Sequence, residues 1–136
     1  QEVLFFALLA AHLEELMRHY ADQQLSRLPK SGDFIEQVSA AVAEVLVHGA
    51  PRLDDVARRM ALSSRSLQRK LREEGTSFQA LANQVRTDLA ASHLAEGKLA
   101  IAEVAFLVGF SEPSAFHRAF KKARGMTPSA FREQAA

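Results

Sequence analysis

The strongest constraint on the fold is an internal repeat in the second half of the chain. The segment LDDVARRMALSSRSLQRKL at 53–71 aligns with IAEVAFLVGFSEPSAFHRAF at 101–120, with one extra residue in the second copy. Apolar residues, small residues and one arginine recur at equivalent places. The matched pairs are Leu53 and Ile101, Val56 and Val104, Ala57 and Ala105, Leu62 and Phe110, Ser63 and Ser111, Leu67 and Phe116, Arg69 and Arg118, and Leu71 and Phe120.

Each copy has the anatomy of a helix-turn-helix unit. A short apolar segment is followed by a turn of three or four residues and then by a second amphipathic segment. Ser63 and Ser111 stand where an N-cap side chain would satisfy the first free amides of the second helix. The small Ala57 and Ala105 let the two helices of a copy approach closely. The sequence therefore predicts two helix-turn-helix units.

The second helix of each copy has one apolar and one polar face. Phe116 and Phe120 are four residues apart, so they share a face that holds this helix to the first one. On the other face, Arg side chains can pair with guanine and Gln with adenine, and later positions can reach phosphates. We therefore predict that the polar faces bind double-stranded DNA in the major groove. The candidate residues are Arg65, Gln68, Arg69 and Arg72 in the first copy and Ser114, His117, Arg118 and Lys121 in the second.

The remaining sequence predicts helices as well. It shows no two-residue alternation and no Asn-Gly or Asp-Gly hairpin turn, and good helix formers dominate it. Gly75, Gly97 and Gly125 stand where a left-handed residue past a helix end is expected. We predict an all-α fold with two helix-turn-helix units joined by a long central helix. The predicted helices cover 2–27, 33–48, 53–60, 64–74, 77–95, 101–108, 112–123 and 128–134.

The length of the predicted central helix has a physical meaning. Its roughly 19 residues span roughly 28 Å at 1.5 Å per residue. Successive major grooves on one face of B-DNA are about 34 Å apart. One chain could therefore place two recognition helices in consecutive grooves.

Charge divides the chain unevenly. Residues 1–49 carry three Lys/Arg against seven acids, whereas residues 50–136 carry fourteen Lys/Arg against nine acids. A basic segment joined to an acidic one suggests a polyanion as the partner of the basic segment. We place the DNA-binding domain at 49–136, and we assign 1–48 to a helical remnant of another domain and its linker. The absence of cysteine fits a reducing cytoplasm.

The stretch IAEVAFLVGFSEPSAFHRAFKKARGMTPSAFR at 101–132 resembles the C-terminal signature of the AraC/XylS family of bacterial transcription regulators. The apolar helix, Gly-Phe turn, Arg-x-Phe-Lys, Gly-x-Thr-Pro and aromatic-Arg stand in the family's order. SLQRKLREEGTSF in the first copy is also similar, so the resemblance covers about 50–134. Residues 1–48 resemble, less specifically, the end of an arabinose-binding-type effector domain and its linker.

The resemblance implies a seven-helix DNA-binding domain that controls transcription, usually as an activator in contact with RNA polymerase. It implies a small-molecule effector for the missing N-terminal domain. Its groove-facing positions fall on Arg65, Gln68 and Arg69, and on Pro113, Ser114, His117 and Arg118. Three residues depart from the pattern. Arg52 and Ala100 replace a capping Ser or Thr, and Pro113 supplies no side-chain donor, so the second unit is expected to make fewer direct base contacts.

Other functions find little support in the residues. No triad, nucleophile elbow or phosphate-cradling loop is present, and His117 has no second ligand at helical spacing, so we expect no enzyme activity, cofactor or metal. The apolar run near the start is too short to span a bilayer and lacks a basic flank. Because the chain begins with Gln inside that run, we expect a fragment of a longer protein. We expect the apolar stripe of 1–27 to be core from the missing domain, a homodimer seam or part of an effector site, and we favour the first two together. The alternative function is a helical protein–protein interaction module that does not bind DNA.

Overall fold

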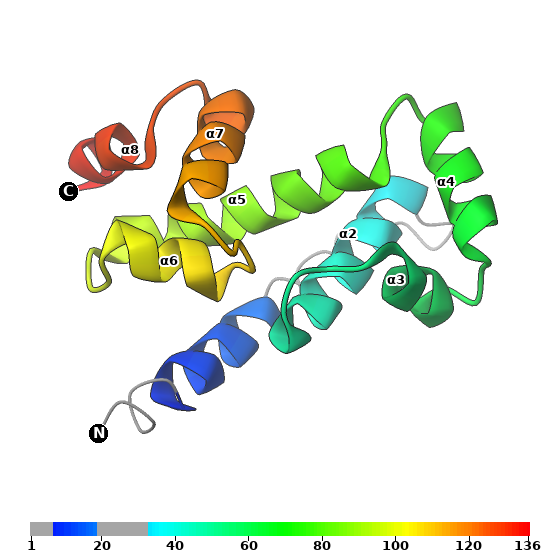
Figure 1. Ribbon diagram of the computed structural model, residues 1–136, viewed down its shortest axis with the longest axis horizontal. Helices are drawn as coiled ribbons and strands as arrows, with labels where there is room; N and C mark the ends of the chain where they lie inside the picture. Colours follow the sequence, from blue (N-terminus) through cyan, green and yellow to red (C-terminus); the bar gives the residue numbers. More distant parts are fainter. Residues whose placement is uncertain (1–6, 19–32) are drawn as a thin grey trace. The chain divides into compact units, whose positions relative to one another are not determined.

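The computed structural model describes residues 7–18 and 33–136, and none of these residues forms a strand. The predicted all-α fold is therefore confirmed for this part of the chain (Figure 1). Residues 7–18 are helical, whereas the other residues of the helix predicted at 2–27 lie outside the described ranges. The named elements are α2 (Phe34–Val45), the 3-10 turn η1 (Leu46–His48), α3 (Leu53–Arg59), α4 (Ser64–Glu73), α5 (Phe78–Glu96), α6 (Ile101–Leu107), α7 (Pro113–Arg124) and α8 (Pro128–Ala135).

The chain divides into two compact units, Gln1–Ala82 and Asn83–Ala136. In the first unit, α3 packs against both α2 and α4. Arg59 on α3 forms an ion pair with Glu44 on α2 at 2.8 Å. The buried side chains of this unit come from all three helices because each presents an apolar stripe to the others. They include Val38, Val42, Val56, Leu67 and Leu71.

The second unit is built around a row of phenylalanine rings. The centroid of Phe116 lies 5.5 Å from that of Phe110 and 5.7 Å from that of Phe120, and Phe120 lies 5.5 Å from Phe131. These tilted arrangements are favourable for aromatic pairs. Phe116 and Phe120 are fully buried, as the four-residue spacing predicts. The row joins the α6–α7 turn, α7 and α8 into one core.

The repeat seen in the sequence extends to a third helix in the structure. A shift of 48 residues, which brings α3 onto α6, also places α2 on residues 82–93 of α5. Under this shift Ser39 corresponds to Thr87, and both side chains are buried. The Ser39 hydroxyl donates to the Ile35 carbonyl at 2.9 Å, and the Thr87 hydroxyl donates to the Asn83 carbonyl at 2.8 Å. Each repeat is therefore a three-helix unit, since two short helices alone leave apolar surface uncovered.

The N-caps of the two second helices differ, and one prediction is wrong. Ser63 caps α4, accepting a hydrogen bond from the Ser66 amide at 3.1 Å. Ser111 is not the N-cap of α7: that position belongs to Glu112, which makes no side-chain cap bond. The reason is Pro113, which starts the helix with its fixed φ and holds the preceding residue in an extended conformation. Arg52 and Ala100 also make no side-chain cap, although the Glu103 carboxylate accepts from the Ala100 amide at 2.9 Å.

The turn between the two helices of each unit contains a left-handed residue at the same place. It is Gly109 in the second unit, with φ 89°, and Ala61 in the first, with φ 57°. Ala61 is the one residue other than glycine with positive φ in the described part of the chain. A side chain in this region costs about 1–2 kcal/mol, because Cβ approaches the following carbonyl oxygen. The first unit therefore holds strain in its turn.

Replacing Ala61 with glycine is expected to raise the free energy of unfolding by about 0.5–1 kcal/mol. Relief of the left-handed strain exceeds the added chain entropy of glycine, which offsets part of the gain. Urea unfolding followed by circular dichroism measures the change. Gly109→Ala is the matched control and should shift stability in the opposite direction. A destabilised Ala61→Gly variant would show that the turn is not strained.

Candidate nucleic-acid interface

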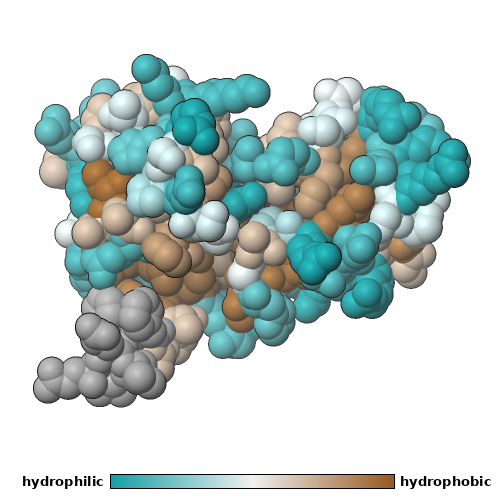
Figure 2. Space-filling view, viewed as in Figure 1, coloured by the Kyte–Doolittle hydropathy of each residue, from teal (hydrophilic) through white to brown (hydrophobic). Residues whose placement is uncertain are grey.

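The four cationic and amide residues predicted on the first recognition helix lie together on one exposed face of α4. All four are exposed, and with Ser63 and Ser66 they line one open surface hollow. Figure 2 shows hydrophilic residues covering the surface over α4. The spacing of three and four residues places them on one side of a helix. This face presents Arg65, Gln68, Arg69 and Arg72 to the solvent.

The opposite face of α4 fixes this arrangement. Leu67 and Leu71 are fully buried, so the helix cannot rotate about its axis without exposing them. The start of α4 is also tied to the start of α3, because the Ser64 hydroxyl donates to the Asp54 carboxylate at 2.5 Å. Together with the Ser63 cap, this bond fixes the angle at which α4 leaves the turn.

Arg69 has a weak partner in the free protein. Its Nε lies 3.9 Å from the Glu73 carboxylate, and both side chains are more than 60% exposed, at 63% and 69%. Such surface pairs contribute about 0–1 kcal/mol. Arg69 can therefore leave Glu73 at little cost when a stronger acceptor approaches.

The second recognition helix presents its predicted residues less uniformly. Pro113, Ser114, Arg118 and Lys121 are exposed on α7. His117 is half-buried, with its ring centroid 6.1 Å from that of Phe116 in an edge-on arrangement. Because part of the imidazole lies against the core, His117 offers less of its side chain to the solvent than the other four residues do.

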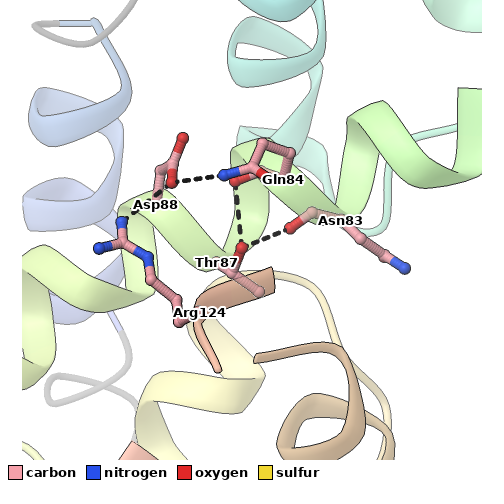
Figure 3. A network of polar contacts seen from close by, with 5 residues as sticks. All are labelled: Asn83, Gln84, Thr87, Asp88 and Arg124. Atoms are coloured by element: carbon pink, nitrogen blue, oxygen red, sulfur yellow. Dashed lines mark hydrogen bonds and ion pairs between the residues drawn. The ribbon is translucent and has the colours of Figure 1, made fainter. Parts of the chain in front are cut away.

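A polar network on α5 and α7 involves residues that sequence reasoning missed. Arg124, in the last turn of α7, forms an ion pair with Asp88 at 2.9 Å, and the Gln84 side chain donates to the same carboxylate at 3.0 Å (Figure 3). The Arg124 guanidinium also lies 5.5 Å from the Phe131 ring centroid. Arg124 therefore links α7 to α5 through Asp88 and to α8 through Phe131. An exposed-looking arginine at a helix end gave no signal of this in the sequence.

Arg132 has a similar structural role on α8. Its Nε donates to the Leu94 carbonyl at 3.4 Å, and its guanidinium also donates to the Leu99 carbonyl. These acceptors lie at the end of α5 and in the loop before α6. The aromatic-Arg pair of the sequence signature thus anchors the last helix of the unit.

The described surface gives no support to an apolar docking groove. The large apolar side chains exposed among the described residues are Leu8, Val47 and Phe106, which lie on three different helical segments. None of the described helices is long and apolar enough to cross a lipid bilayer. The exposed charged faces of α4 and α7 fit a polyanionic partner.

Together, these features define a double helix-turn-helix DNA-binding domain. A family model described as a helix-turn-helix domain matches residues 56–134. The chain belongs to this family, whose AraC-type members are DNA-binding transcription regulators, as the resemblance predicted.

Named relatives and a solved structure agree with this assignment. The chain is 42% identical over 83 residues to an ornithine utilization regulator of Pseudomonas aeruginosa, covering 61% of this chain and 24% of that protein. It is 35% identical over 82 residues to a urease operon transcriptional activator of Escherichia coli, covering 60% and 28%. A DNA-binding transcriptional dual regulator from Escherichia coli K-12 superposes with a TM-score of 0.62 at 28% identity, covering 72% of this chain and 91% of that one. The chain thus spans about a quarter of the length of these curated relatives.

Proposed function

We propose that this chain is the DNA-binding part of a longer transcription regulator and that α4 and α7 each enter the major groove. The observation that carries the proposal is the single exposed face of α4. Its guanidinium and amide groups match the acceptor and donor patterns of guanine and adenine. In this proposal Arg65, Gln68 and Arg69 contact base edges, and Arg72, further along the helix, contacts a phosphate.

The second unit contributes fewer base contacts in this proposal. Pro113 has no donor, and His117 is partly occupied by its contact with Phe116. Ser114 and Arg118 remain as exposed donors near the start and middle of α7, with Lys121 further along. We therefore assign α7 mainly to phosphate contacts, with less influence on sequence preference than α4.

Arg69→Ala and Arg118→Ala should have different effects on DNA binding. Loss of Arg69 should weaken binding to the preferred sequence by about 1–3 kcal/mol and relax base preference, whereas loss of Arg118 should weaken binding to all sequences more evenly. Fluorescence anisotropy on a panel of single-base variants of a selected site measures both. Lys98→Ala removes an exposed charge outside the recognition helices and serves as the control. Equal losses of specificity in both variants would refute the distinction.

The intact regulator, in this proposal, is a cytoplasmic effector-responsive activator. Its relatives are about four times as long as the matched segment, and one of them is named an activator. The domain boundary predicted at 48/49 moves in this proposal, because α2 packs against α3 and belongs to the first helix-turn-helix unit. Residues 1–32 then belong to the effector or dimerisation domain and its linker, and 33–136 form the DNA-binding domain. A small-molecule effector bound in the further domain would alter promoter occupancy, and activation would proceed through contact with RNA polymerase.

We also propose that the apolar segment at 1–27 supports a homodimer. Leu13 and Met17 are buried within the chain, whereas Leu8 is 63% exposed, so part of the stripe is open to a partner. Sedimentation equilibrium should give a concentration-dependent dimer that becomes monomeric when 1–32 are deleted. A strictly monomeric full chain, or a shortened chain that still dimerises, would place the interface elsewhere.

A further inference from the structure

Arg86 is a buried cation in the second unit. It lies on α5 and is 8% exposed. One guanidinium nitrogen donates to the Gly109 carbonyl at 3.2 Å, and the guanidinium carbon lies 4.2 Å from the centroid of the Phe110 ring. Its Nε has no hydrogen-bond partner, and none of the acids in the described part of the chain forms an ion pair with it. Both contacts are with the turn between α6 and α7.

Burying the Arg86 guanidinium in the core costs free energy. A buried charge without an ionic partner loses its hydration, and the burial lowers the pKa of the Arg86 guanidinium. The cation–π contact and a single hydrogen bond recover part of that loss. Even a buried ion pair, whose two charges offset each other, can often be replaced by apolar side chains of similar volume with a neutral or stabilising effect. Stability alone therefore does not explain an arginine at this position.

The equivalent core position of the first unit holds an uncharged side chain. The 48-residue shift brings Val38 of α2 onto the position of Arg86, and Val38 is fully buried. An aliphatic side chain at this position is therefore enough to complete the core of a helix-turn-helix unit in this chain. The reason for an arginine at this position must lie in a feature that only the second unit has.

The feature that only the second unit has is a weakly fixed start of α7. In the first unit, the Ser63 cap and the Ser64–Asp54 bond fix the entry into α4. The second unit has a turn one residue longer, and Glu112 provides no side-chain cap for α7. Arg86 contacts Gly109 and Phe110 in this turn, where the second unit lacks the side-chain cap that fixes the start of α4.

We propose that Arg86 is a positioning residue for the second recognition helix. By holding the Gly109 carbonyl and the Phe110 ring, it sets the direction in which α7 leaves the turn and hence the alignment of Ser114 and Arg118 with DNA. The proposal rests on the proposed function of α7 as a DNA-contacting helix. Arg86 itself does not touch DNA and acts through the turn.

The test compares Arg86→Met with Lys98→Met in the full chain. Both remove one positive charge from the second unit, but Lys98 is exposed and lies outside the turn. The readouts are thermal melting, affinity for a duplex selected by the unmodified chain from a random pool, and amide NMR shifts at 109–118. We expect Arg86→Met to melt no lower than the parent, to shift the amides of 109–118, and to bind about tenfold more weakly, because α7 loses its alignment with the DNA. Lys98→Met should leave the amides of 109–118 unchanged.

The outcomes separate this proposal from the proposed function. If the unmodified chain selects no sequence, the proposed function fails. Whatever the DNA result, unshifted amides at 109–118 in Arg86→Met would overturn the role of Arg86 in holding the turn. If the parent binds and Arg86→Met binds equally well, the positioning role is wrong. If Arg86→Met does not fold, Arg86→Lys decides, because its ammonium keeps the charge but cannot lie flat on Phe110. A folded lysine variant with weakened binding supports the proposal, and one equal to the parent overturns it.

Discussion

Phe116→Ala is expected to lower the free energy of unfolding by about 3–5 kcal/mol, a large share of the stability of a small domain. The ring is fully buried and lies between those of Phe110 and Phe120, so its removal opens a cavity in the centre of the second unit. Thermal melting and chemical unfolding measure the loss. DNA affinity should fall in proportion to the unfolded fraction, because the side chain does not reach the surface.

The matched control for this prediction is Phe106→Ala. Phe106 lies on α6 in the same unit but is 67% exposed, so its truncation should change stability little. A Phe116→Ala variant that melts like the parent and yet fails to bind DNA would mean that the ring contacts DNA or a partner instead of the core.

Affinity for DNA is expected to fall about 10²-fold between 50 and 200 mM salt, if Arg72 and three exposed cations of α7 each neutralise one phosphate. Each neutralised phosphate releases counterions, so four such contacts give a slope of about −4 in log affinity against log salt. Fluorescence anisotropy titrations at several salt concentrations measure this slope. The four cations are Arg72, Arg118, Lys121 and Lys122.

Single variants make the salt prediction sharper. Arg118→Ala should reduce the magnitude of the slope by about 1, because a phosphate contact is removed. Arg124→Ala provides a contrast, since Arg124 is paired with Asp88 in the free protein and is not among these four cations. Binding that stays flat across this salt range would contradict an electrostatic interface.

Much of the fold could be predicted from local sequence pattern. Apolar residues at helical spacing, such as Phe116 and Phe120, predicted both the helix and its buried face. Gly75, Gly97 and Gly125 marked helix ends, and all three have positive φ. These features depend on short-range spacing and on the special backbone freedom of glycine. The all-α fold and the two helix-turn-helix units followed from them.

The third helix of each repeat could not be recognised because few of its residues match. Val38 and Arg86 occupy equivalent positions, yet one is aliphatic and the other charged. The common feature of α2 and α5 is a backbone-directed hydroxyl at Ser39 and Thr87. Such a similarity of hydrogen bonding has almost no signature in a sequence comparison.

The candidate site was predicted as a set of exposed side chains, and the residues that support it were missed. Arg65, Gln68 and Arg69 were found because spacing alone places them on one face. Arg86 was missed because arginine is seldom buried without an ionic partner, so an arginine in a sequence is expected to be exposed to solvent. The supposed cap at Ser111 failed because Pro113 sets the start of α7, which is a backbone effect two residues away.

Selection of bound sequences from a random DNA pool tests the central claim most directly. We expect the unmodified chain to enrich a defined sequence, and we expect Arg69→Ala, selected in parallel, to lose preference at the base pairs read by α4 while keeping the rest. Arg118→Ala should enrich the same bases as the parent with weaker overall recovery. A pool that shows no enrichment, or an Arg69→Ala motif identical to that of the parent, would contradict the assignment of α4 as the sequence-reading helix.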